Sequence, residues 1–170
     1  MKIQPSHISE LEELTKLAKT TFLQSHGHCA SALEVASYVD ENFTVENLEQ
    51  ELNDEENLYH SLYQDGELVG YSKLNLNYPY KAVKQKACAK MERLYLLDKT
   101  HGTGLGKAFF DFNVALAQYH KQTGIWLFVW VENYRAIRFY EKQGFQIVGQ
   151  HDFRISDRHS NPNHQMLLTF

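Results

Sequence analysis

A glycine-rich loop between a strand and a helix places the strongest constraint on the fold of this chain. Residues 90–97 read as a strand, and the loop from Gly102 to Gly106 follows within a few residues. Helical periodicity begins directly after the loop. Because the first turn of a helix leaves backbone N–H groups without partners, this order of elements predicts an anion-binding cradle within an α/β fold.

Two well-known phosphate-binding loops do not fit this spacing. A dinucleotide-binding fingerprint would place its third glycine at position 107, which is Lys107, and no acidic residue follows at the required distance. A nucleoside triphosphate loop needs Ser or Thr after its Gly-Lys pair, but Gly106-Lys107 is followed by Ala108. The anion is therefore expected to belong to another class of ligand.

The rest of the chain supplies the other layers of the fold. Helices are expected to begin at the capping pairs Ser9 with Glu12 and Ser31 with Glu34, and at Thr44. The Asp65-Gly66 pair predicts a type I′ hairpin turn. Further strands are expected over residues 2–4, 57–64, 67–77, 125–131, 146–153 and 165–170, and a further helix over residues 134–143. The pattern predicts a single α/β domain, 1–170, with a mixed central sheet of about seven strands flanked by helices on both faces.

Composition excludes several functional classes. The net charge of −4 argues against a nucleic-acid binder. No run of the sequence approaches 18 apolar residues, so no membrane-spanning helix is expected. Two cysteines without zinc spacing indicate a reduced, cytoplasmic protein. The run His26-Gly-His-Cys29 offers no identifiable fourth ligand, so no metal is expected.

The charges are divided unevenly along the sequence. Between Thr20 and Ser72 there are eleven acidic residues and no Lys or Arg. The following stretch is basic, with Lys73, Lys81, Lys84, Lys86, Lys90, Arg93, Lys99 and Lys107. This division predicts either solvated faces of opposite sign or a cation site beside an anion site.

Two sequence blocks carry a specific resemblance. The strand Met91-Glu-Arg-Leu-Tyr-Leu-Leu97, with the loop that follows, resembles the core motif of the GNAT acetyltransferase superfamily. The block from Trp126 to Phe145 is similar to the second superfamily motif, including its Asn, its Phe-Tyr pair and its Gly-Phe. The chain also resembles the bacterial PaiA-type polyamine acetyltransferases. One departure is His101, which stands where the superfamily prefers Gln or Arg.

This resemblance implies the GNAT fold and acetyl-coenzyme A as cosubstrate. Backbone amides of the loop would hold the pyrophosphate, and the backbone of the preceding strand would pair with the pantetheine arm and the acetyl carbonyl. Asn133 would also bind the pantetheine arm, unless it serves as a helix N-cap instead or in addition. The implied cofactor-binding residues are Leu94, Tyr95, Leu96, His101, Gly102, Thr103, Gly104, Leu105, Gly106, Lys107, Asn133 and Tyr140.

Two residues are candidates for proton transfer. In the family pattern Tyr140 protonates the departing thiolate; the alternative is a packing role beside Phe139. An acceptor amine must lose a proton, and Glu92, on the motif strand, is the candidate base. An ion pair with a neighbouring Lys or Arg is an equally open interpretation of Glu92.

The acidic segment favours a small cationic acceptor such as spermidine or spermine. In the fold of the family, this segment helps to wall the acceptor side of the cleft. Two alternatives remain open: a protein N-terminal or lysine acetyltransferase of the same fold, and a non-catalytic acyl-coenzyme A sensor. Neither nucleic acid nor membrane is expected as a partner, and a homodimer is left open.

Overall fold

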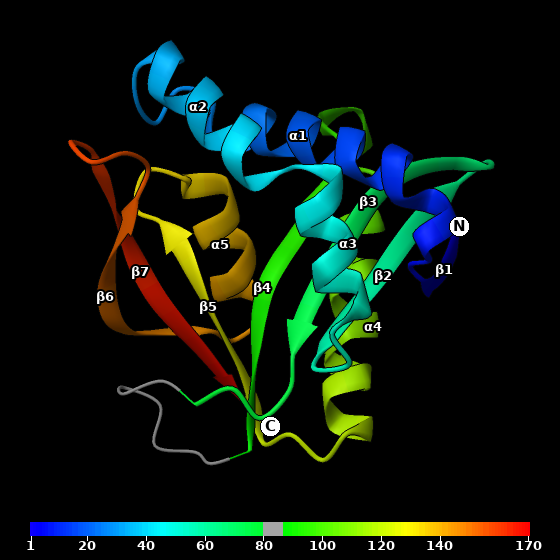
Figure 1. Cartoon of the computed structure of the whole chain (residues 1–170). Coiled ribbons are helices and arrows are strands. Elements are labelled where there is room, and N and C mark those ends of the chain that lie inside the picture. Colours follow the sequence, from blue (N-terminus) through cyan, green and yellow to red (C-terminus); the bar gives the residue numbers. More distant parts are fainter. Residues whose placement is uncertain (80–86) are drawn as a thin grey trace. The chain divides into compact units, whose positions relative to one another are not determined.

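A computed structural model describes residues 1–79 and 87–170. Seven strands form a mixed sheet in the order β1-β2-β3-β4-β5-β7-β6, which confirms the predicted fold class (Figure 1). Lys81, Lys84 and Lys86 of the basic stretch lie outside the described residues. The strands are β1 (Lys2–Pro5), β2 (Asn57–Gln64), β3 (Glu67–Asn75), β4 (Cys88–Leu96), β5 (Gly124–Trp130), β6 (Gln146–Arg154) and β7 (Ser160–Thr169).

The helices complete the α/β order of elements. None in the described part of the chain has the length and apolar character needed to cross a bilayer. The α-helices are α1 (Leu11–His26), α2 (Ala32–Asn42), α3 (Val45–Asn53), α4 (Leu105–Tyr119) and α5 (Tyr134–Lys142), with short 3-10 helices η1 (Ile8–Glu10) and η2 (Asp98–Thr100).

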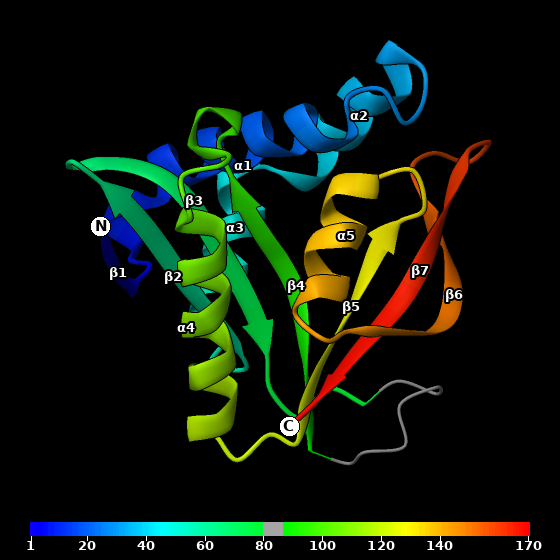
Figure 2. The ribbon, with the colours of Figure 1, turned by 180° about the vertical axis from the view of Figure 1, so that it is seen from behind.

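The chain divides into two compact units, and the first comprises residues 1–74 and 93–113. In this unit, α1 and α3 lie on one face of β2 and β3, and the first half of α4 lies on the other (Figures 1 and 2). A buried apolar cluster joins α4 to β2 and β3, and it consists of Leu62, Val69, Leu105 and Phe109. This burial of apolar side chains anchors the start of α4, and with it the glycine loop.

Helix starts in the first unit follow the predicted capping signals in two cases of three. The Ser31 hydroxyl accepts from the Glu34 amide at 3.3 Å, and the Thr44 hydroxyl accepts from the Asn47 amide at 3.0 Å. The prediction for Ser9 is wrong, because η1 precedes α1 and occupies this position. The Glu10 carboxylate instead accepts from the His7 amide at 3.3 Å.

The β2–β3 hairpin turns as predicted. Asp65 and Gly66 both have positive φ, 52° and 86°, as a type I′ turn requires. Further along β3, Gly70 lies close to β4: a Cβ atom there would meet the Tyr95 carbonyl oxygen at 2.9 Å. This position therefore needs glycine for the two strands to approach.

The second unit comprises residues 75–92 and 114–170. Here β5 pairs with β4 in parallel from Cys88 to Lys90, and with β7 antiparallel along its whole length. The strand β7 starts at Ser160 rather than at the predicted position 165, because its first residues pair with β6. In Figure 2, α5 lies on the near side of β5.

The aromatic stripe of β5 belongs mainly to the core. Trp126 and Trp130 are 1% and 5% exposed, as predicted, while Phe128 is partly buried. The Trp126 indole N–H donates to the Tyr78 carbonyl at 2.7 Å, which holds the segment after β3. Phe128 stacks on His151 at 4.3 Å between ring centroids.

The acidic segment from Thr20 to Ser72 meets basic residues from outside it. Lys19 pairs with Asp40, Lys73 and Arg93 both pair with Glu51, and Lys99 pairs with Glu67. The negative charge of the acidic segment is therefore partly neutralised by basic residues from other parts of the chain. The acidic residues that remain exposed on α2, α3 and the following turn include Asp40, Glu41, Glu46, Glu49, Asp54, Glu55 and Glu56.

Candidate active site

The glycine loop is built as an open cradle at the start of α4. Gly102 and Gly104 have positive φ, 78° and 85°, which explains why glycine occupies these positions. A Cβ atom at Gly102, Gly104 or Gly106 would have no heavy atom within 4 Å among the described residues. A ligand can therefore approach the loop backbone closely.

The loop amides fall into two sets. His101 and Thr103 donate to the carbonyls of Asp98 and Thr100, and the Leu105 amide donates to the Thr103 hydroxyl. Within the described residues, the amides of Gly102, Gly104, Gly106 and Lys107 have no recorded hydrogen-bond acceptor. Together with the dipole of α4, these four amides suit a phosphate group. Of the predicted amides from His101 to Gly106, the three glycine N–H groups remain available.

The strand β4 presents backbone groups on the edge that faces away from β3. The Leu97 amide donates to the Val69 carbonyl of β3 at 2.9 Å. Because backbone groups alternate along a strand, those of Leu94 and Leu96 point to the opposite edge. The registered pairing of β4 with β5 ends at Lys90. Leu94 and Leu96 therefore present their backbone groups at this edge, where an extended amide chain could pair with them, while the Tyr95 carbonyl faces β3.

Charged side chains around the loop are already engaged. Lys107 pairs with Asp111 one helical turn further on, and Lys99 pairs with Glu67. The His101 imidazole lies 3.2 Å from the Asp98 carboxylate. The cradle therefore relies on backbone amides, and its lysines would have to exchange partners to reach a phosphate.

Asn133 and Tyr140 belong to the second unit. The Asn133 side-chain oxygen accepts from the Ala136 amide at 3.1 Å, which makes Asn133 the N-cap of α5. Tyr140 is partly buried between Phe139 and Phe145, each with its ring centroid 5.3 Å away. This burial raises the pKa of the Tyr140 phenol, so the phenol keeps its proton at neutral pH.

Glu92 forms an ion pair with Lys90, which is one of the two interpretations left open by the sequence. The Lys90 ammonium also lies over three aromatic rings: 5.3 Å from the centroid of Trp126, 5.4 Å from Tyr78 and 5.7 Å from Phe128. Glu92 would have to leave Lys90 in order to accept a proton from a substrate.

The structure also shows a polar cluster that the sequence analysis missed. Arg93 of β4 and Glu51 of α3 form a two-point contact beside Tyr59 and Lys73. The available signal was that Arg93 shares one face of β4 with Met91 and Tyr95, because a charge among apolar neighbours on a half-buried face needs a partner. The segment between Thr20 and Ser72 offered many acids and no reason to choose Glu51.

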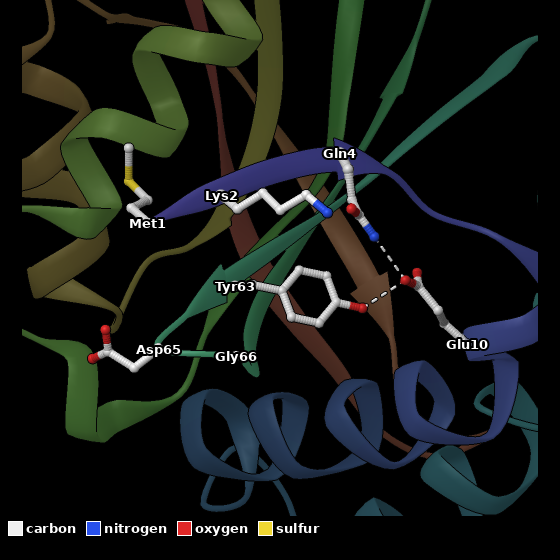
Figure 3. Close-up of a pocket in the computed structure, with 7 residues that line it drawn as sticks. All are labelled: Met1, Lys2, Gln4, Glu10, Tyr63, Asp65 and Gly66. Atoms are coloured by element: carbon white, nitrogen blue, oxygen red, sulfur yellow. Dashed lines mark hydrogen bonds between the residues drawn. The ribbon is translucent and has the colours of Figure 1, made fainter.

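A hollow of about 510 Å³ lies elsewhere in the first unit, at one end of β1 and β2 (Figure 3). The Glu10 carboxylate accepts from the Gln4 amide at 2.8 Å and from the Tyr63 hydroxyl at 2.7 Å. None of the predicted site residues lines this hollow. It is lined by Met1, Lys2, Gln4, Glu10, Tyr63, Asp65 and Gly66.

Comparison with known proteins identifies relatives along nearly the whole chain. An uncharacterized N-acetyltransferase of Mycobacterium tuberculosis is 30% identical over 154 residues, which cover 91% of this chain and 94% of that protein. The spermine/spermidine N(1)-acetyltransferase of Bacillus subtilis is 32% identical over 93 residues, 54% of this chain and 61% of that protein.

Solved structures show the same fold. The crystal structure of the PaiA N-acetyltransferase from Thermoplasma acidophilum, in complex with coenzyme A, has a TM-score of 0.78 at 20% identity. The match covers 99% of this chain and 98% of the other. The model of the acetyltransferase (GNAT) family matches residues 11–145, which include β4, the glycine loop and α5. The chain belongs to the acetyltransferase (GNAT) family.

Proposed function

We propose that this N-acetyltransferase moves the acetyl group of acetyl-coenzyme A to a primary amine of a small cationic molecule, and that spermidine or spermine is such an acceptor. The cofactor part is supported by the amides of Gly102, Gly104 and Gly106 at the start of α4, which have no acceptor among residues 1–79 and 87–170. A pyrophosphate needs such a set of donors.

The edge of β4 supports the same cofactor. The arm of coenzyme A carries amides, which pair with strand backbone as another strand does. Leu94 and Leu96 offer their backbone groups on one edge, directly before the loop that would hold the phosphates. A backbone N–H here would also polarise the acetyl carbonyl, as donors in an oxyanion hole do.

Proton transfer would involve Tyr140 and Glu92. A phenol that keeps its proton at neutral pH can donate it to a departing thiolate, and the position of Tyr140 in the second family motif supports this role. The acceptor must react as a neutral amine, and deprotonating a group of pKa 10.4 at pH 7 costs about 4.6 kcal/mol. Glu92 would accept this proton after its ion pair with Lys90 opens.

Two observations support a polyamine as the acceptor. One is the similarity to the spermine/spermidine acetyltransferase of Bacillus subtilis and to the PaiA protein. The other is the group of exposed carboxylates on α2 and α3, among them Glu41, Glu46 and Glu49. A surface potential of this sign attracts a multiply charged cation over long range.

The test is a panel of acceptors incubated with acetyl-coenzyme A, with the released thiol detected and the product identified by mass spectrometry. We expect spermidine and spermine to be acetylated with higher kcat/KM than monoamines and peptides. Higher kcat/KM for peptides would favour the protein acetyltransferase alternative. Binding of acetyl-coenzyme A with no thiol release from any acceptor would favour the sensor.

A further inference from the structure

A partly buried ionic cluster ties β4 to its neighbours in the first unit. The Arg93 guanidinium donates to both carboxylate oxygens of Glu51, from Nη1 at 2.7 Å and from Nη2 at 3.2 Å. Tyr59 of β2 donates to the same carboxylate, and the Lys73 ammonium of β3 lies 3.1 Å from it. The Arg93 side chain is only 14% exposed. One carboxylate of α3 thus joins three strands.

Electrostatics favours a charged Glu51 in this cluster. Burial opposes ionisation, but Arg93, the Tyr59 hydroxyl and Lys73 outweigh it and lower the pKa of Glu51. The Arg93 guanidinium also lies 5.3 Å from the centre of the Phe43 ring, within the range of a cation–π contact. The two-point contact with Glu51 orients the fork of Arg93 relative to α3.

An ionic cluster of this kind fixes the relative positions of its residues more than it stabilises the fold. Removing two charges from water costs about as much as their attraction returns, and a well-packed apolar pair often stabilises a fold equally well. The two-point contact of Arg93 instead fixes distance and angle, because both N–H···O bonds must be satisfied together. The contact therefore fixes the position of β4 at residue 93.

The residues that follow Arg93 in β4 form the edge that faces away from β3. Arg93 directly precedes Leu94 and is three positions before Leu96, and the backbone groups of both leucines point away from β3. The registered pairing of β4 with β5 has already ended at Lys90. Two contacts with β3 hold β4 in the plane of the sheet. They are the close approach of the strands at Gly70 and the hydrogen bond from the Leu97 amide to the Val69 carbonyl. The contact of Arg93 with Glu51 of α3 restrains β4 in the direction perpendicular to the sheet, at the residue where the exposed edge begins.

We propose that Arg93, clamped by Glu51, is a positioning residue that sets the backbone of Leu94 to Leu96 for binding the pantetheine arm of acetyl-coenzyme A. This role rests on the proposed function, in which that edge receives the arm. Arg93 acts through the strand and does not touch the cosubstrate. The exposed edge of β4 is preorganised by the clamp, so less free energy is spent on ordering it when the arm binds.

The test compares two ligands in calorimetric titrations of the full chain. Acetyl-coenzyme A contacts both the glycine loop and the edge of β4, whereas its nucleotide half, 3′-phosphoadenosine 5′-diphosphate, has no pantetheine arm. Arg93→Met should weaken acetyl-coenzyme A binding about tenfold and leave nucleotide binding within twofold. Arg93→Lys keeps the charge but lacks the fork, and should show most of the same loss. Lys19→Met breaks an exposed ion pair of the same unit and should change neither affinity.

Tyr59→Phe provides a milder variant in case Arg93→Met does not fold. It removes one donor to Glu51 without changing shape or charge, and should weaken acetyl-coenzyme A binding in the same selective way. Unchanged acetyl-coenzyme A affinity in a folded variant overturns the positioning role, and so does an equal loss for both ligands. A wild-type chain that binds the nucleotide half but gains nothing from the arm also overturns it. A wild-type chain that binds neither ligand refutes the proposed function itself.

Discussion

A buried histidine should make the stability of this protein depend on pH. His60 of β2 is 8% exposed and packs against the ring of Phe112, with 4.8 Å between ring centroids. Its Nδ1 atom is buried without a hydrogen-bond partner among the described residues. Burial lowers the pKa of His60 from 6.5 to about 4. Between these values the unfolded chain binds a proton that the folded chain does not.

The sign and size of the effect follow from linkage. The contribution of His60 to stability is fully present above pH 6.5 and is lost as the pH falls toward 4. Between pH 7.5 and pH 5 the loss amounts to about 2 kcal/mol for one such group. His60→Leu should remove this loss, because leucine fills the apolar site and does not titrate.

Urea unfolding at pH 7.5 and pH 5 measures the difference. The free energy of unfolding of wild type should fall by about 2 kcal/mol more than that of His60→Leu over this interval. His26, whose pKa is lowered to about 4 by burial and by His28, titrates in both proteins and cancels from the comparison. His120→Gln, at an exposed position, should behave as wild type does. An equal pH dependence in wild type and His60→Leu would show that the pKa of His60 does not change on folding.

Three further predictions concern catalysis, acceptor attraction and packing. Tyr140→Phe should lower kcat roughly 100-fold with little change in acetyl-coenzyme A affinity, measured by steady-state kinetics and calorimetry; a change within twofold would assign the proton to another donor. The KM for spermidine should rise with salt, because screening shortens to about 8 Å at 0.15 M, and Glu41→Gln, Glu46→Gln and Glu49→Gln together should flatten that rise. A rise of equal steepness in the triple variant would argue against these carboxylates. Gly70→Ala should destabilise the fold by about 1–3 kcal/mol in urea unfolding, because its Cβ atom would press on the Tyr95 carbonyl; unchanged stability would mean that β3 and β4 can separate at no cost.

Much of the fold could be predicted because its signals are local. The hairpin at Asp65-Gly66 and the caps at Ser31 and Thr44 depend on residues within four positions of each other. The strand, loop and helix around Gly104 depend on one short segment as well. The prediction of a helix N-cap at Ser9 was wrong because Ser9 lies inside the 3-10 helix η1, which Glu10 stabilises.

What the sequence could not reveal depends on distant pairs. Glu51 and Arg93 are 42 positions apart, and only the fold brings the carboxylate under the strand. The acidic stretch is partly neutralised by Lys19, Lys73 and Lys99, which lie before or after it. Net charge along a segment therefore gives a poor estimate of charge at a site. The amides of His101, Thr103 and Leu105 were also expected to be available, but local hydrogen bonds already engage them.

A substitution at Gly106 tests most directly the proposal that the glycine amides at the start of α4 hold the phosphates of acetyl-coenzyme A. A side chain there has open space around it and its φ is not positive, so Gly106→Ala and Gly106→Glu should both fold. The glutamate even suits the first turn of a helix, but it would repel phosphate. In calorimetric titrations with acetyl-coenzyme A, wild type and Gly106→Ala should bind, whereas Gly106→Glu should show no binding. Equal affinity in Gly106→Glu and Gly106→Ala would show that these amides do not hold the phosphates.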